Sequence, residues 1–196
     1  MITNEMFQKL GEKFSIEPAL LKAVAIVECG LDLNGFLADG KPKILFEGHI
    51  FYRELLKVNP KATVVRISRS HPSICYESWT KQFYLGGMDE YDRYDEARKI
   101  NPECAMLATS WGFPQIMGFN YPSCGCQSVT EFVGKMRESE EYQMELWYHF
   151  LYNQKLIPIL KEHDWETFTR KYNGPGQVNV YSQKLMNTYN NLKGRV

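Results

Sequence analysis

Apolar residues recur every three or four positions along most of the chain, and this spacing predicts amphipathic α-helices. The first of them is short and carries Phe7, Leu10 and Phe14 on one face. Caps, prolines and glycines mark where the later helices begin and end. Further helices are predicted over residues 17–30, 49–57, 89–97, 102–108, 130–137, 140–155, 164–172 and 178–192.

The second predicted helix differs from the others because it is apolar on nearly every side. Its sequence, ALLKAVAIVEC, follows Pro18, which suits the first helical position, and it stops at Gly30. A helix without a polar face has to be buried on all sides. We therefore expect the helix to form the centre of the core.

Strand signals are few. Residues 43–46 and 63–68 are rich in β-favouring side chains, and we expect the small amount of β-structure there. Residues 72–87 are aromatic without periodicity, which predicts a long loop. The chain shows no repeat and no linker. These patterns predict a mainly α fold with a small β element, formed by one domain over residues 1–196.

Composition limits the partners of this domain. The 23 lysines and arginines balance the 23 aspartates and glutamates, so bulk charge does not draw the protein to nucleic acid or to an anionic membrane. The first residues, MITNEMFQKLGEKF, contain no continuous apolar stretch, so we expect neither a signal peptide nor a membrane anchor. Nothing in the pattern indicates more than a monomer.

Five cysteines are an odd number, so one at least has no partner within the chain. Their spacing lacks the paired C-x-x-C arrangement of a zinc site, and Cys124 and Cys126 have no histidine nearby in sequence. We expect reduced thiols, synthesis in a reducing cytoplasm, and neither a metal nor another cofactor.

Glu28 is the first candidate for chemistry, because it falls in the last turn of the predicted buried helix. Desolvation and the negative end of the helix dipole both oppose ionisation, so the pKa of this carboxyl should rise. A carboxylic acid that stays protonated near neutral pH can protonate the leaving oxygen of a glycosidic bond. The alternative is that the helix frays and Glu28 is an ordinary surface residue.

Glu47 is the candidate for a second carboxylate. It follows the apolar run ILF and precedes a predicted helix, whose N-terminal amides favour the anionic form. Two carboxyls with pKa values pushed apart are the arrangement that glycoside cleavage uses. An ordinary helix cap explains Glu47 equally well, and Asp32 and Asp39, in the loop after Glu28, compete for the same role.

The run SWGFPQIMGFNY, which begins at Ser110, is predicted to form one wall of a binding site. Its glycines permit close approach of the backbone, and aromatic rings such as that of Trp111 offer flat faces to sugars. Gln115 and Asn120 supply amides for hydroxyl and acetamido groups. An uncharged wall suits a neutral polymer, whereas the alternative reading is an aromatic turn in the core.

Taken in order, these segments resemble the N-acetylmuramidase family found in bacteriophage endolysins, within the lysozyme-like superfamily. The resemblance rests on the glutamate after the buried helix and on the blocks GKPKILFEGHIF, ATSWGFPQIMGFNY and RKYNGPGQVNVYSQKL, and it runs from about Glu17 to Leu192. It implies a two-lobed helical fold with a cleft between the lobes. It also implies hydrolysis of the β-1,4 bond between N-acetylmuramic acid and N-acetylglucosamine in peptidoglycan.

The resemblance also implies residue roles. Glu28 matches the catalytic acid of the family, and Glu47 matches the glutamate of its LFE-H-F block. The two later blocks line the substrate cleft in this superfamily, which makes four of their residues expected binding residues: Gln115, Asn120, Tyr172 and Asn173. Two positions depart from the family pattern, namely Cys29, where a serine is usual, and Pro114 before the glutamine.

The family context implies how such a protein reaches its substrate. We expect it to wait in the host cytoplasm until a separate membrane-permeabilising protein releases it to the cell wall. We expect no separate wall-binding domain, so that the cleft alone holds the glycan strand.

Two other functions remain open from the sequence. A lytic transglycosylase would cleave the same bond without water and leave a 1,6-anhydro sugar. A non-catalytic wall-binding or virion protein would keep the body of the fold, but it would have no need of Glu28. The spacing of residues does not tell whether the anomeric centre is retained or inverted.

Overall fold

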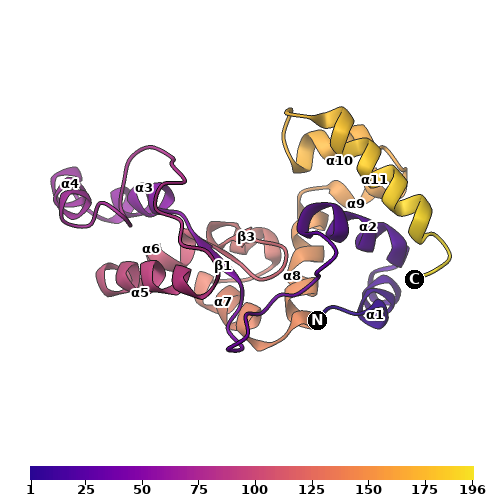
Figure 1. Cartoon of the computed structure of the whole chain (residues 1–196), viewed down its shortest axis with the longest axis horizontal. Coiled ribbons are helices and arrows are strands. Elements are labelled where there is room, and N and C mark those ends of the chain that lie inside the picture. The colour runs from indigo at the N-terminus through magenta and orange to yellow at the C-terminus, as the bar shows by residue number, and fades with distance from the viewer.

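The computed structural model describes residues 1–196, which form two helical lobes (Figure 1). One lobe, on the right in Figure 1, holds the two ends of the chain. Its helices are α1 (Asn4–Phe14), α2 (Pro18–Cys29), α9 (Leu156–Lys161), α10 (Trp165–Tyr172) and α11 (Val178–Leu192). Helix α2 packs against α1 and α11, so two segments far apart in sequence enclose it.

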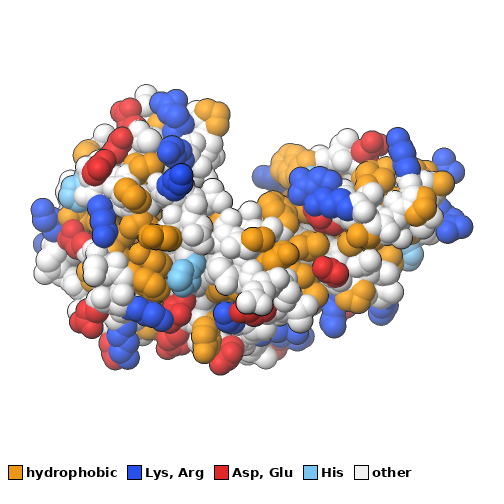
Figure 2. Space-filling view, turned by 180° about the vertical axis from the view of Figure 1, so that it is seen from behind, with side chains coloured by type: hydrophobic (Ala, Val, Ile, Leu, Met, Phe, Trp, Pro, Cys, Tyr) orange, Lys and Arg blue, Asp and Glu red, His pale blue; other side chains and the backbone are white.

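The other lobe lies on the left in Figure 1 and is built from the middle of the chain. Its helices are α3 (Gly48–Val58), α4 (Lys61–Ser70), α5 (Glu90–Ile100) and α6 (Pro102–Leu107). Helices α7 (Val129–Glu138) and α8 (Glu140–Asn153) lie between the lobes. Because α8 contacts α7, α9 and α1, it ties the lobes together, and a deep notch opens between them in Figure 2.

A small antiparallel sheet stands beside this notch. Its strands are β1 (Ile44–Phe46), β2 (Thr109–Trp111) and β3 (Ile116–Met117), in the order β1-β2-β3. Ile44 pairs with Trp111, and Trp111 pairs in turn with Ile116. A 3-10 helix, Gly118–Cys124, follows β3 directly. The sheet thus brings the run SWGFPQIMGFNY next to the strand predicted at residues 43–46.

Helix α2 is buried as its sequence predicted. Pro18 occupies the first turn, and Gly30, with φ of 82°, ends the helix in a backbone conformation that other residues rarely adopt. Six of its residues, from Ala19 to Ala25, are buried. Burial of the apolar turns fixes the axis of the helix, and its last turn, with Glu28, reaches the space between the lobes.

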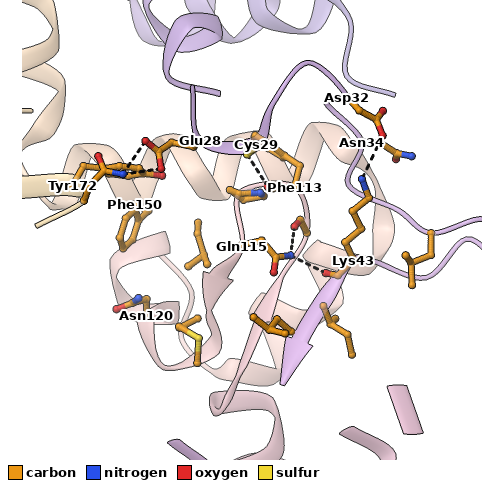
Figure 3. A pocket seen from close by; sticks show the side chains of 18 of the residues that line it. Glu28, Cys29, Asp32, Asn34, Lys43, Phe113, Gln115, Asn120, Phe150 and Tyr172 are labelled. Carbon is orange, nitrogen blue, oxygen red and sulfur yellow. Dashed lines mark hydrogen bonds and ion pairs between the residues drawn. The ribbon is translucent and has the colours of Figure 1, made fainter. Parts of the chain in front are cut away.

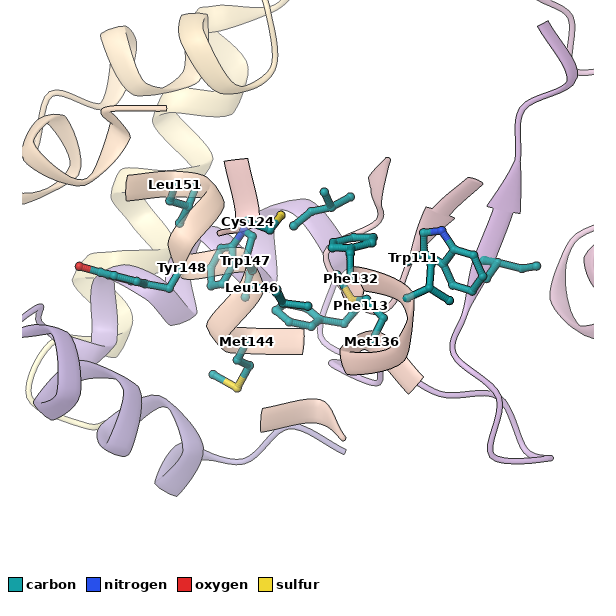
Figure 4. Close-up of a cluster of buried hydrophobic side chains, with 14 of the residues drawn as sticks. Trp111, Phe113, Cys124, Phe132, Met136, Met144, Leu146, Trp147, Tyr148 and Leu151 are labelled. Atoms are coloured by element: carbon teal, nitrogen blue, oxygen red, sulfur yellow. The ribbon is translucent and has the colours of Figure 1, made fainter. Parts of the chain in front are cut away.

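One hydrophobic cluster of 46 buried residues runs through the molecule. Figure 4 shows the part near α7 and α8, where the rings of Phe113 and Trp147 meet edge to face at 5.5 Å. All five cysteines are free thiols, and all of them except Cys29 are buried. None of the helices combines the length and apolar character that crossing a membrane requires.

The prediction of β-structure at residues 63–68 is wrong, since these residues lie in helix α4. Their β-branched side chains favour strands locally, but the sheet forms from other residues, and this segment packs as a helix against α3. Val64 is fully buried and Ile67 partly buried, three positions apart on one helical face. Asp89 precedes α5 as predicted, but its side chain makes no capping hydrogen bond.

Candidate active site

A cavity with a volume of about 800 Å³ lies between the two lobes. Its lining comes from the end of α2, the loop after it, the sheet, the 3-10 helix after β3, α8 and the end of α10. Among the lining residues only Glu28, Asp32 and Lys43 carry charge. The cleft is therefore mainly uncharged, with two carboxyl groups and one ammonium group at defined places.

Glu28 lies at one end of the cleft, beside Phe150 and Tyr172 (Figure 3). The side-chain amide of Asn173 donates hydrogen bonds to both carboxylate oxygens, at 2.9 and 2.8 Å. The side chain is exposed to the cleft, but the surrounding protein atoms remove part of its hydration. This desolvation raises the pKa of Glu28, and the hydrogen bond from Asn173 opposes the rise. Desolvation prevails, as the sequence predicted.

Tyr172 and Asn173 are held where α10 ends. The indole N–H of Trp147 donates to the Tyr172 hydroxyl at 3.2 Å, and the ring of Phe168 stacks on the Tyr172 ring at 5.4 Å. The backbone N–H of Asn173 donates to the carbonyl of Thr169 at 2.8 Å. Because neighbouring side chains hold both its ring and its hydroxyl, Tyr172 has a fixed position in the wall of the cleft. Asn173, the next residue in the chain, is held beside it.

Cys29 connects the end of α2 to the turn between β2 and β3. Its thiol donates to the carbonyl oxygen of Phe113 at 3.0 Å, and the backbone N–H of Phe113 donates to Gln143 at 2.9 Å. Burial, and secondarily the charge of Glu28, raise the pKa of Cys29 to about 11. The thiol therefore stays neutral and serves as a hydrogen-bond donor, a role that the serine usual in the family could also fill.

Gln115 lines the cleft, but its amide also closes the turn between β2 and β3. Its oxygen accepts from the Ser110 hydroxyl at 2.8 Å, and its nitrogen donates to the Gly112 carbonyl at 2.7 Å. Gln115 and Gly112 both have positive φ, of 48° and 70°. Pro114, the second departure from the family pattern, lies in this turn and also lines the cleft. The turn is therefore held by its backbone conformation and by the hydrogen bonds of the Gln115 side chain.

Asn120 lines the cleft from the 3-10 helix after β3, and its side-chain amide makes no hydrogen bond within the protein. Its amide can therefore bind a ligand without giving up an internal bond. Four predicted binding residues, Gln115, Asn120, Tyr172 and Asn173, all come to the cleft from two distant parts of the chain.

Trp111, the fifth predicted binding residue, does not reach the cleft. It is fully buried in β2, where its indole N–H donates to the Met106 carbonyl at 3.2 Å and its ring meets Tyr94 edge to face. A side chain without exposed surface cannot stack on a sugar, so the prediction of Trp111 as a binding residue is wrong. The physical reason is that every residue of β2 is buried.

The candidates for the second carboxylate occupy different surroundings. Glu47 is not among the residues that line the cleft, and both of its oxygens accept from the Tyr84 hydroxyl, at 2.8 and 2.7 Å. Asp39 also lies outside the lining and pairs with Lys41 at 2.9 Å. Asp32 lines the cleft, and its carboxylate lies 3.9 Å from the Lys43 ammonium. The structure brings Asp32, and neither rival, into the cleft with Glu28.

Several lining residues have no signature in the sequence. Asn34 and Lys43 lie with Asp32 at the end of the cleft opposite Glu28 in Figure 3. Phe150 belongs to the regular apolar pattern of α8, which indicates only a core position. Phe150 lines the cleft because α8 lies between the two lobes, and no sequence motif marks this position.

Comparisons with known proteins agree with this geometry. A family model described as N-acetylmuramidase matches residues 17–193. Among solved structures, the Burkholderia AP3 phage endolysin is similar, with a TM-score of 0.87 and 32% sequence identity over 98% of this chain and 71% of that chain. No curated protein matches the sequence. The chain belongs to the N-acetylmuramidase family and is a glycosidase of the lysozyme-like fold that hydrolyses peptidoglycan.

Proposed function

We propose that Glu28 is the general acid with which this muramidase cleaves the β-1,4 bond between N-acetylmuramic acid and N-acetylglucosamine. The observation that carries the proposal is the position of Glu28 in the cleft, with its pKa raised by desolvation and its carboxyl group oriented by Asn173. In its protonated form Glu28 gives its proton to the leaving glycosidic oxygen as the bond to the anomeric carbon breaks. Water then adds to that carbon, and its proton returns to the carboxylate.

Asp32 is the second group in this proposal, in place of Glu47. It is the other carboxyl group in the lining of the cleft, and it faces the Lys43 ammonium. A carboxylate at this end either stabilises the positive charge that develops on the sugar ring or orients the attacking water. Glu47 is assigned a supporting role, because its oxygens are engaged by Tyr84.

The substrate in this proposal is a glycan strand that lies along the cleft. Asn120 offers a free amide to hydroxyl or acetamido groups, and Tyr172 and Phe150 offer ring faces. Gln115 holds the turn that forms one wall of the cleft. Its amide oxygen accepts one hydrogen bond from Ser110 and can accept a second one from the substrate. The nearly uncharged lining suits the hydroxyl and acetamido groups of the strand.

The biological setting is that of a phage endolysin. The similarity to the Burkholderia AP3 phage endolysin supports this role. The protein works as a monomer on the cell wall, after a separate membrane-permeabilising protein has released it from the host cytoplasm. The five free thiols agree with synthesis in a reducing compartment.

Mass spectrometry of the fragments released from purified peptidoglycan tests the reaction. Hydrolysis predicts fragments with a reducing N-acetylmuramic acid end, each one water heavier than the 1,6-anhydro product of a transglycosylase. Asp39→Asn serves as the control, since Asp39 is a carboxylate outside the cleft, and it should give the wild-type products. Anhydro fragments from the wild type would contradict hydrolysis, and intact peptidoglycan would contradict the whole proposal.

A further inference from the structure

A long segment beside the cleft has no part in the chemistry described so far. It comprises residues 72–88, here called the rim loop, and it connects α4 with α5. In Figure 1 the loop arches above α3 on the upper side of its lobe, the side on which the notch between the lobes opens in Figure 2. Gly87, at the end of the loop, lines the cleft. The rim loop is thus continuous with the site.

A buried ion pair binds both ends of the rim loop. Arg93 and Glu90 are almost without exposed surface and bind each other. Arg93 also donates to the carbonyl of Ser73 at 2.9 Å, near the start of the loop. Near its other end, the backbone N–H groups of Leu85 and Gly86 donate to the second carboxylate oxygen of Glu90, at 2.9 and 3.1 Å. Both ends of the loop are therefore bound to the same buried ion pair.

The middle of the loop is held as well. The Tyr84 hydroxyl donates to Glu47, which is 14% exposed, and the ring of Tyr76 packs on that of Phe83 at 5.2 Å. Burial, and secondarily the hydrogen bond to Glu47, raise the pKa of Tyr84. These contacts hold the loop on both sides of Trp79, at Tyr76 and at Phe83 and Tyr84.

The anchored loop carries three exposed apolar side chains. Trp79, Leu85 and Met88 are 58%, 57% and 49% exposed, within ten residues of sequence. Single exposed apolar residues are normal, but a group of them on a fixed loop beside a binding cleft marks a contact surface. The Lys81 ammonium lies 5.8 Å from the centre of the Trp79 ring and adds a cation to this surface.

We propose that the rim loop is a platform that binds the glycan strand beyond the cleft, with the Trp79 indole stacked on a sugar ring. The idea rests on the proposed function, which places a long polymer in a cleft that holds only a few of its sugars. The apolar face of a pyranose matches an indole, and the continuity through Gly87 favours the strand over other occupants. The hydrogen bond from Tyr84 to Glu47 holds this part of the loop in place.

Binding to purified glycan strands, stripped of their stem peptides by an amidase, tests the platform. Every protein in the comparison carries Glu28→Gln, which prevents cleavage during the measurement. Adding Trp79→Ala should raise the dissociation constant roughly tenfold, the cost of removing an exposed aromatic anchor. The increase should be smaller for a short oligosaccharide that fills the cleft alone. Tyr152→Ala is the matched control, since Tyr152 is 59% exposed and does not line the cleft.

Each outcome is decisive. Equal affinities for long strands with and without Trp79 would overturn the platform while leaving the proposed function intact. A loss that is seen only when stem peptides are attached would overturn the glycan as occupant. A Glu28→Gln reference protein that binds neither strands nor oligosaccharide would contradict both proposals. Thermal unfolding of each variant shows whether Trp79→Ala preserves the fold, as the exposure of this side chain predicts.

Discussion

Glu28 and Asn173 form the contact on which the site depends at the scale of single residues. The amide donates to both carboxylate oxygens and so favours the charged form, while partial desolvation favours the neutral form. Because the desolvation prevails, the carboxyl keeps its proton to higher pH than an ordinary glutamic acid does. Two consequences of this balance can be measured.

The first consequence concerns the pH dependence of activity. A general acid must be protonated, so activity falls as the pH rises through the pKa of Glu28. Asn173→Ala removes the contact that lowers this pKa, and the alkaline limb of the kcat/KM profile should move to higher pH. Asn120→Ala is the control, because Asn120 lines the same cleft without binding Glu28, and its limb should not move. A limb that moves to lower pH with Asn173→Ala would contradict the assignment.

The second consequence concerns stability. Since the pKa of Glu28 is higher in the folded chain than its ordinary value of 4.5, the folded state binds its proton more tightly than the unfolded state does. This contribution to stability is complete below pH 4.5 and is lost as the pH rises through the folded pKa. Glu28→Gln avoids that loss, so its melting temperature should exceed that of the wild type at neutral pH, with a smaller difference at pH 4 or below. Equal differences at both pH values would contradict the raised pKa.

The sequence predicted part of the site, and the failures have physical reasons. Glu28 could be placed because a buried helix with a clear end determines where its last turn lies. Trp111 could not be placed in this way, because the same aromatic run supplies residues to the cleft and to the core. Only the strand pairing in the folded chain decides which of these residues are buried. Asp32 and its rival Asp39 share one loop, and the course of a loop depends on contacts that spacing does not encode.

At the scale of elements, the turn between β2 and β3 joins the sheet to the cleft. Gly112 lies there with φ of 70°, packed against the Gln143 side chain, which also accepts from the Phe113 N–H. Helices with one clear apolar face, such as α1 and α10, were predictable from spacing alone. Helix α4 was not, because its β-branched residues favour a strand locally and only tertiary contacts decide against it.

Two glycine substitutions test this view of the turn. In Gly112→Ala the new Cβ would lie 2.6 Å from the Gln143 amide oxygen, at a backbone angle that alanine resists. We expect a loss of about 2 kcal/mol in the free energy of unfolding, with reduced activity. Gly134→Ala, in the exposed middle of α7 with open space around it, should instead gain about 0.5 to 1 kcal/mol. Chemical denaturation measures both, and a neutral Gly112→Ala would contradict the close packing.

At the scale of the whole molecule, two lobes share one hydrophobic cluster, and α8 ties them together. The cleft is therefore a gap between parts of one folded unit, and it gathers residues from α2, the sheet and α10 that are far apart in sequence. In this arrangement a few side chains face the cleft, and the rest of the chain holds them in position.

The most direct test of the account is the activity of Glu28→Gln on two substrates. On purified peptidoglycan, whose leaving group needs a proton, kcat/KM should fall roughly a thousandfold, as expected for loss of a general acid. On an aryl glycoside with a nitrophenolate leaving group, which departs without protonation, most of the activity in the bond-breaking step should return. A variant that is equally impaired on both substrates, or active on both, would contradict the assignment of Glu28 as the acid.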